Sequence, residues 1–445
     1  MKFLMPAFGA VGGGFFVVLV LGLADGNEKL LFSGLAGLNT AICLHQFLRS
    51  FQNEERDIFN PISIFIIFFF FYHVMPVLAL IATSSEPIDI AAYMPALWVT
   101  FAAILSFEAG LILFRPRRLS AIPALAVNNM FQLSIPLILV VAGPFMGTIG
   151  FGSAQIGFLI VLFALLAMKD SRDLPIRIIC IIFVVYALYI SRSEFSRAFI
   201  LQSGLMILIF YNYYVRRLVL IEFLLISIIA LFLLFIMAFL RGYDQLFEGE
   251  AFAFSRFVTY MNNFFILTDF TPATASRFLR TTDFPMAYES FRMVVENVPR
   301  NVDYLFGETY LKYLLFVVPR DIYPDKPIDL HTLYVHVFLN PHSVHYSNSP
   351  LLLGELYWNG GYLGVILGML LSAAMVKWVC RYRRLVSSNN LYFSLYIVFL
   401  TTLPLFMRGS TATITIHVIT VQIVPTLLIF LFLNLLSYNR RRSLS

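Results

Sequence analysis

Long apolar runs separated by short polar connections dominate this chain of 445 residues. A helix needs about 20 mostly apolar residues to cross the ~30 Å hydrocarbon core of a bilayer. Runs of about this length fall at 6–24, 29–48, 61–83, 91–114, 124–147, 151–168, 175–191, 197–214, 218–240, 353–379, 390–407 and 415–436. The pattern predicts an all-α polytopic membrane protein with about twelve transmembrane helices.

The basic residues of the short connections indicate the orientation. Cytoplasmic loops of membrane proteins carry an excess of Lys and Arg. One set of loops and ends holds Lys2, Arg49, Arg56, Arg115, Arg117, Arg118, Lys169, Arg172, Arg177, Arg216, Arg217, Lys377, Arg381, Arg383, Arg384, Arg440, Arg441 and Arg442. The opposite set holds only Lys29, Arg192, Arg197 and Arg408. The alternation predicts that both termini are cytoplasmic.

One connection, residues 241–352, is far longer than the others. Loops beyond about 15 residues are usually functional or disordered, and this one is rich in aromatic and apolar residues, as in "YLFGETYLKYLLFVV". We expect a folded external cap of short helices lying on the membrane. The chain then divides into helices 1–9 at 1–240, the external cap at 241–352 and helices 10–12 at 353–445.

Composition agrees with a membrane protein and excludes several other classes. Hydrophobic residues make up 60% of the chain and charged residues 13%, against about 25% charged in soluble proteins. The net charge of +6 is explained by the loops, so we expect no nucleic-acid partner. The three cysteines show no metal-ligand spacing. No phosphate-binding loop, dinucleotide fingerprint or metal motif is present, and we expect no cofactor and no metal.

Positive charges on the predicted outer face are the most informative residues, because they oppose the general bias. Four regions bring such charges to one level of the membrane: Arg192 with Arg197, Arg241, Arg320 with Lys326, and Arg408. Arg suits bidentate phosphate recognition, and Lys acts as a point charge. Single arginines of this kind also occur as snorkelling residues at helix ends. As a set they favour an anionic ligand, such as a lipid pyrophosphate.

Polar residues near the tenth predicted span form a second group of candidates. Glu355 opens that span, where an acid is costly and often functional, although it could instead complement the dipole of the helix. Gly354, Gly360, Gly361 and Gly364 leave one helix face bare, which favours close packing. The preceding histidines, His331, His336, His342 and His345, lack the usual partners of a zinc site. Further polar groups within the spans follow no regular spacing: His45, His73, Glu108, Glu222 and His417.

Two neighbouring motifs resemble a known family. "PRDIYPDKP" at 319–327, followed by "SNSPLLLGELYWNGGYLG" at 347–364, resembles the signature of the Wzy-type O-antigen polymerases of bacteria. The motifs cover about forty residues, and the rest of the chain agrees in layout. The related O-antigen ligases carry a His-Asn pair before a similar helix. Here Ser347 and Asn348 stand at that place and His345 comes two residues early, which argues against a ligase.

The resemblance implies a glycosyltransferase of the bacterial inner membrane with its active site facing the periplasm. It would move a growing glycan from undecaprenyl pyrophosphate to the non-reducing end of a new lipid-linked repeat unit. We expect Arg192, Arg197, Arg241, Arg320, Lys326 and Arg408 to bind the pyrophosphates. Glu355 or His345 would orient or deprotonate the acceptor hydroxyl. Tyr323, Tyr357 and Asn359 are the expected glycan contacts.

The partners implied are the undecaprenyl-pyrophosphate-linked glycan, the bilayer, and possible chain-length regulator and flippase proteins. The main alternative from another class is a flippase for lipid-linked oligosaccharides, which would also have about twelve helices. Such transporters usually have short loops and two related halves. The long cap and the lack of visible repeat symmetry speak against that reading.

Overall fold

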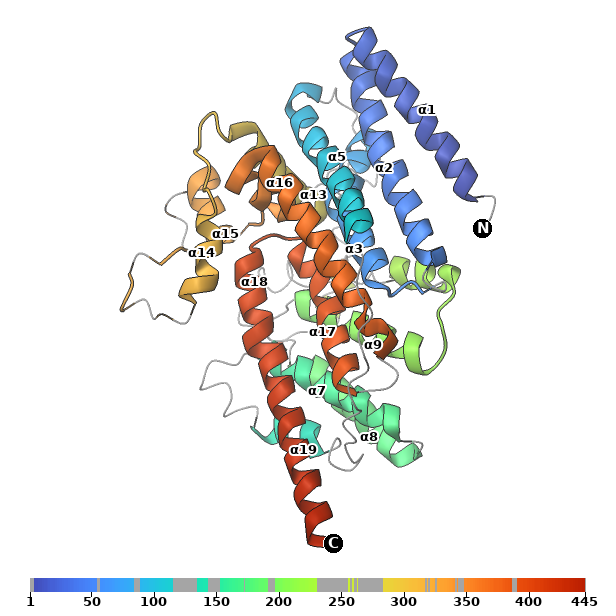
Figure 1. The fold of residues 1–445 in the computed structure, drawn as a ribbon, viewed down its shortest axis with the longest axis vertical. Helices are drawn as coiled ribbons and strands as arrows, with labels where there is room; N and C mark the ends of the chain where they lie inside the picture. The colour runs from blue at the N-terminus through green and yellow to red at the C-terminus, as the bar shows by residue number, and fades with distance from the viewer. Residues whose placement is uncertain are drawn as a thin grey trace. The chain divides into compact units, whose positions relative to one another are not determined.

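The computed structural model describes residues 4–444 except 54–56, 84–88, 115–133, 143–152, 172, 191–196, most of 230–282, 317, 319–320, 325, 341, 343–347 and 386–389. Within the described part all regular elements are helices (Figure 1). Two compact units can be distinguished. The first comprises Met1–Arg115, Leu224–Lys377 and Pro404–Thr413, and the second Pro116–Phe223, Trp378–Leu403 and Ile414–Ser445.

The first unit begins with a helical hairpin, α1 (Leu4–Ala24) and α2 (Glu28–Asn53). The Asn27 side chain accepts hydrogen bonds from the backbone N–H groups of Lys29 and Leu30, which caps α2. The two helices run side by side (Figure 1). A Cβ on Gly34 would lie 2.7 Å from the backbone nitrogen of Leu19, so a glycine is needed for this close approach.

The third predicted span is one continuous helix made of α3 (Pro61–Phe69), a π-helical turn η1 (Phe70–Val74) and α4 (Met75–Thr83). Asn60 caps it by accepting from the Ser63 N–H at 2.9 Å, and Pro61 occupies the first helical position, where its missing N–H costs nothing. Ser50 at the end of α2 donates to Asn60 at 2.8 Å. This buried contact joins α2 to α3.

The helix α5 (Ile90–Leu113) packs against α2. The described part of the predicted cap adds α13 (Asp283–Asn297), α14 (Glu308–Leu315), α15 (Leu330–Tyr334) and a π-helical turn η3 (Val335–Leu339). Of these, α13 packs against α5 and η1, with the Phe291 ring 5.5 Å from His73 and the Phe284 ring 4.8 Å from Tyr72. The aromatic residues of the segment therefore serve as its packing surface.

The tenth predicted span, α16 (Leu351–Cys380), is broken in the middle. Gly360 is extended and Gly361 has a positive φ of 59° with ψ of −147°. A Cβ on Gly364 would lie 2.3 Å from the Leu356 carbonyl oxygen, because the second half of the helix begins against the end of the first. The glycines thus do not form one bare face of a straight helix, as the sequence had suggested; they permit a break.

The second unit contains α7 (Ser153–Asp170), α8 (Leu174–Ile190), α9 (Arg197–Tyr214), most of α17 (Asn390–Phe406) and α19 (Val424–Leu444). A short helix η4 (Tyr382–Leu385) and a π-helical turn η5 (Val418–Ile423) complete it. Residues Ile156–Ala167 of α7 are buried, and α7 contacts α8, α9 and η5. The central helix of this unit is therefore α7.

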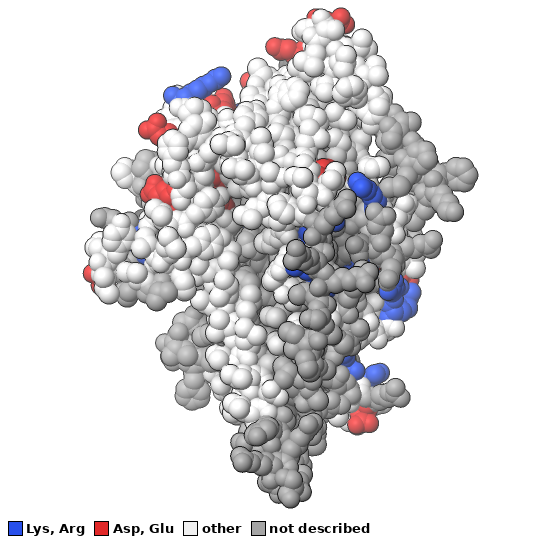
Figure 2. Space-filling view, viewed as in Figure 1, with Lys and Arg blue, Asp and Glu red and all other residues white. Residues whose placement is uncertain are grey.

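Five described helices are long and apolar enough to cross a membrane: Glu28–Gln52, Pro61–Ile81, Ile90–Leu113, Leu351–Cys380 and Thr411–Leu435. Shorter apolar helices coincide with further predicted spans, such as Gln155–Lys169 and Asn390–Phe406. On the face drawn in Figure 2, charged side chains are sparse among uncharged ones. The all-helical, multi-pass architecture is confirmed, whereas the count of twelve spans and the orientation remain predictions.

Candidate functional site

The site is built around the turn that joins α17 to α18 (Thr411–His417) and carries Arg408. Gly409 and Ser410 both have positive φ, 79° and 57°. A Cβ on Gly409 would lie 2.7 Å from the Leu351 carbonyl oxygen, so only glycine fits there. The Met407 carbonyl accepts a hydrogen bond from the Leu352 N–H at 3.0 Å. The turn is thus pressed against the beginning of α16.

Glu355, in the second turn of α16, holds this turn from one side. Its side chain is fully buried, and its carboxylate accepts hydrogen bonds from the Thr411 N–H at 2.8 Å and the Thr411 hydroxyl at 3.1 Å. The N-terminus of a helix carries unpaired N–H groups and partial positive charge. Glu355 therefore caps α18, and not its own helix as the alternative reading of the sequence supposed.

Asp329 holds the same turn from the other side. It is the N-cap of α15, accepting from the His331 N–H at 3.1 Å. Its other oxygen accepts from the Ser410 hydroxyl at 2.7 Å and from the Thr413 hydroxyl. The Lys312 ammonium lies 3.4 Å from the Asp329 carboxylate and donates to Thr413 at 2.8 Å. A carboxylate with this many donors is firmly positioned.

The electrostatics of Asp329 reflect these contacts. Burial acts to raise the pKa of Asp329, but the Thr413 and Ser410 hydrogen bonds and the nearby His331 and Lys312 outweigh it, so that the pKa lies below its ordinary value. Asp329 is therefore ionised at neutral pH. The chain thus keeps a permanent negative charge beside the Arg408 turn.

His331, one of the four clustered histidines, belongs to this network. Its Nδ1 lies 3.6 Å from Asp329, and the buried Nε2 has no hydrogen-bond partner in the described part of the chain. Burial lowers the pKa of His331 in spite of the Asp329 carboxylate, so the imidazole is neutral near pH 7. Among the described residues, no three His, Cys, Asp or Glu side chains are placed to share a metal ion.

The three expected glycan contacts have different environments. Asn359 is buried; its carbonyl oxygen accepts from the Gly307 N–H at 3.0 Å, and its amide donates to the Glu355 carbonyl at 2.8 Å and to the Thr309 hydroxyl at 2.9 Å. These bonds tie α14 to α16. Tyr357 is buried and its ring lies 5.7 Å from that of Tyr362. Tyr323 is exposed.

The predicted phosphate-binding residues fall into two groups. Arg192, Arg241 and Arg320 lie outside the described residues, as does the candidate base His345, and the side chain of Arg197 is not described. Lys326 and Arg408 are described. The Lys326 ammonium donates to the carbonyls of Phe316 and Val318, both at 3.1 Å, and so closes the proline-rich loop. Arg408 makes no ion pair and no side-chain hydrogen bond within the described part of the chain.

The sequence reasoning missed several members of the network: Lys312, Asp329, Ser410, Thr411 and Thr413. A helix N-cap pattern at Asp329, directly before an apolar run, was available as a signal. The hydroxyl-rich "RGSTAT" after Arg408 was a second one. Nothing in the sequence joined the two segments, because 81 residues separate Asp329 from its partner Ser410. The contact depends on the tertiary fold.

Comparison with known families finds a match in the C-terminal part of the chain. The family model described as O-antigen polysaccharide polymerase Wzy matches residues 349–440. The matched region contains Glu355, the Arg408 turn and Thr411. Comparison with curated proteins and with solved structures gives no significant match. The match supports polymerase activity in polysaccharide biosynthesis and a membrane location. Over residues 349–440, this chain is therefore similar to the family described as O-antigen polysaccharide polymerase Wzy.

Proposed function

We propose that the protein polymerises undecaprenyl-pyrophosphate-linked repeat units on the external face of the bacterial inner membrane. The growing glycan is transferred from one lipid carrier to the non-reducing end of a new lipid-linked unit. The observation that carries this proposal is the fixed turn holding Arg408, which Glu355 and Asp329 clamp from two sides. The turn lies within the region that matches the polymerase family.

In the proposed reaction, a sugar hydroxyl of the acceptor attacks the anomeric carbon of the donor glycan. The bond from that carbon to the pyrophosphate oxygen breaks, and undecaprenyl pyrophosphate leaves while the hydroxyl proton passes to a base. The leaving group gains negative charge in the transition state. A guanidinium held in advance stabilises that charge without reorganisation. Arg408, with Arg192, Arg197, Arg241, Arg320 and Lys326, supplies this stabilisation.

The geometry favours a positioning role for Glu355. Both of its oxygens accept hydrogen bonds from Thr411, so its carboxylate keeps the Arg408 turn in place. His345 is then the proposed base for the acceptor hydroxyl. Tyr323 and Tyr357 are proposed to contact the glycan, and Asn359 to keep α14 against α16 beside it.

The test is deletion of the gene in its host, followed by gel separation of surface glycans and analysis of extracted lipid-linked intermediates. The proposal expects single repeat units, either capped on lipid A or accumulating outside the membrane. Full-length polymer stranded on undecaprenyl pyrophosphate would instead indicate a ligase. Single units trapped on the cytoplasmic side would indicate a flippase. Either of the last two results overturns the proposal.

A further inference from the structure

The C-terminal end of α16 borders a polar cavity of about 100 Å³. Lys377 lies near the end of the second half of α16, about 24 Å along that half from the break at Gly361, at 1.5 Å per helical residue. The cavity lies where the C-terminal ends of α2, α5 and α16 meet the start of α3. Its polar lining includes Gln46 and Arg49 from α2, Glu108 from α5, and Lys377. All of these residues belong to the first unit.

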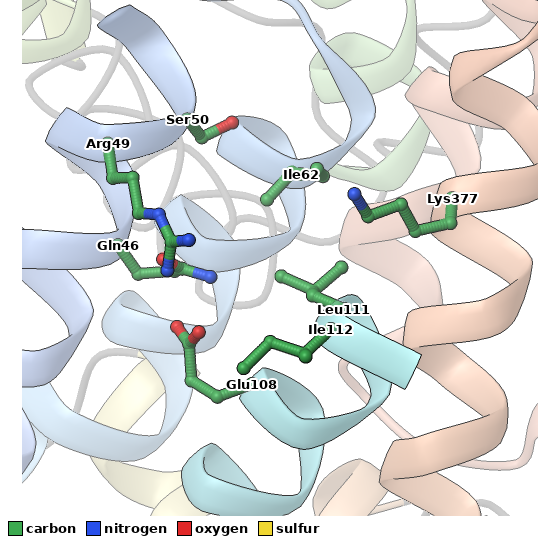
Figure 3. Close-up of a pocket in the computed structure, with 8 residues that line it drawn as sticks. All are labelled: Gln46, Arg49, Ser50, Ile62, Glu108, Leu111, Ile112 and Lys377. Carbon is green, nitrogen blue, oxygen red and sulfur yellow. The ribbon is translucent and has the colours of Figure 1, made fainter. Parts of the chain in front are cut away.

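The charges of this cavity do not neutralise each other through direct contacts. Figure 3 shows the Arg49 guanidinium beside Gln46 and above Glu108, with Lys377 reaching in from the opposite side. Within the part of the chain that the structure describes, neither Arg49 nor Lys377 makes an ion pair or a side-chain hydrogen bond. Among the described residues of the lining, two cations and one carboxylate leave a net positive charge. Such a cavity attracts an anion, and Arg and Lys are the usual phosphate ligands.

Gln46 gives an independent indication of a ligand. The residue is 4% exposed, and its buried side-chain oxygen has no hydrogen-bond partner among the residues that the structure describes. Leaving a buried acceptor unpaired costs about 1–3 kcal/mol, so such groups usually have a partner. Arg49 and Lys377 line the same cavity but do not donate a hydrogen bond to this oxygen. A hydrogen-bond donor on the occupant of the cavity would supply that partner.

The remaining walls indicate an occupant that is partly apolar. Ile62 and Ile112 also line the cavity. Ile112 is 60% exposed and the next residue, Leu113, 69%, so an apolar strip leads from the cavity along the end of α5. A phosphate in the cavity would pair with the cations, and acyl chains attached to it would cover the exposed apolar strip.

We propose that this cavity binds a phosphate group that carries a hydrogen-bond donor, as in phosphatidylethanolamine or phosphatidylglycerol. The phosphate pairs with Arg49 and Lys377, and the ammonium or hydroxyl of the headgroup donates to Gln46 and Glu108. Free hydrogen phosphate offers the same chemistry without acyl chains. On the predicted orientation the site is at the cytoplasmic face, away from the proposed polymerase site. It is therefore independent of the proposed function.

The test is a titration of the purified full-length protein in detergent, followed by native mass spectrometry. The probes are inorganic phosphate and the dioctanoyl forms of phosphatidylethanolamine, phosphatidylglycerol and phosphatidylcholine. We expect the ethanolamine and glycerol lipids to bind more tightly than the choline lipid, whose headgroup has no N–H or O–H donor. Tight binding of inorganic phosphate with no preference for the lipids would support a free-phosphate site. Equal binding of all three lipids would overturn the proposed role of Gln46.

Substitutions in the lining of the cavity test whether the ligand binds there. The double variant Arg49→Gln, Lys377→Gln should weaken binding of phosphatidylglycerol and phosphate by about ten-fold or more, since two charge-assisted bonds are lost. Arg177→Gln, on a helix of the second unit, is the matched control and should leave binding unchanged. An unchanged affinity in the double variant overturns the proposal.

Glu108→Gln tests the same site without removing a cation, which matters if the double variant does not fold. Removing the carboxylate beside Arg49 should tighten binding of inorganic phosphate and phosphatidylglycerol several-fold, because a like charge no longer opposes the ligand. If Arg49 and Lys377 only snorkel to the membrane surface, Glu108→Gln changes neither affinity. That result also overturns the proposal.

Discussion

The polar side chains at the N-terminal and C-terminal ends of α16 are in different environments. At the N-terminal end, Glu355 and Asp329 accept hydrogen bonds from the segment 410–413 and hold the Arg408 turn. At the other end, the Gln46 oxygen has no hydrogen-bond partner among the described residues, and Arg49 and Lys377 line a cavity. Buried groups that are hydrogen-bonded have a defined geometry, whereas cations that line a cavity without partners leave room for a ligand. The first end therefore positions a charge for chemistry, and the second is suited to binding.

The sharpest test of this comparison is removal of the positioned charge. Arg408→Ala should reduce polymer formation by about 100-fold or more, the loss typical of one oxyanion-stabilising donor. Arg408→Lys should retain part of the activity, because it keeps the charge but not the bidentate geometry. The measurement is the glycan ladder on a gel after expression of each variant in the deletion strain. Normal long chains with Arg408→Ala, at equal protein levels, would refute its role.

The double variant at the other end of α16 is the control for this experiment. Arg49→Gln, Lys377→Gln removes two cations of the same helical unit, but neither touches the Arg408 turn. It should therefore leave polymer in the ladder. Complete loss of polymer in both variants would show that the two ends do not differ as proposed.

The next largest effect is expected from loss of the Glu355 hydrogen bonds that hold the Arg408 turn. Glu355→Gln places an amide where Thr411 donates two hydrogen bonds, leaving a buried donor unpaired at a cost of about 1–3 kcal/mol. We expect shortened glycan chains and a Tm lower by about 1 °C per kcal/mol, measured by thermal unfolding in detergent. Thr411→Ser keeps both bonds and is the control. An unchanged Tm and a normal glycan ladder would show that the Glu355 hydrogen bonds do not hold the Arg408 turn.

The break in α16 permits a paired comparison of adjacent glycines. Gly361→Ala forces a side chain into a positive-φ conformation and brings Cβ to 2.9 Å from the Tyr304 hydroxyl. We expect it to destabilise the protein by about 1–3 kcal/mol. Gly360→Ala should have little effect, because its backbone is extended and no atom lies within 4 Å of the added Cβ. Equal Tm values for the two variants would argue against a fixed break.

The smallest effect concerns pH. The folded-state pKa of Asp329 lies below its unfolded value of about 3.9. Its contribution to stability is therefore fully present above that unfolded value and is lost as the pH falls through the folded pKa. The Tm of Asp329→Asn should lie below that of the parent at pH 7 and approach it below about pH 4. A constant difference across this range would show that Asp329 acts only through its shape.

Some expectations from the sequence depended on local pattern and were met. The apolar runs at 29–48, 91–114 and 390–407 became α2, α5 and α17, with ends within a few residues. Such runs are explained by burial and lipid contact along a single helix, so neighbouring residues are sufficient to predict them. The signature around Glu355 was also read correctly, since the family match covers it.

Other features were decided only by the tertiary structure. The sequence showed Glu355 as an acid at a helix entry, but its partner Thr411 is 56 residues away. Asn359 is predicted to contact the glycan. In the structure its side-chain amide joins α14 to α16. The sequence also did not show that Gln46 and Glu108 line the same cavity. A single chain specifies helices through short-range periodicity, whereas hydrogen bonds between distant segments require those helices to be packed first. For this reason the sequence determined the membrane class and the family signature, and the packing of α16 against its neighbours decided which polar residues act together.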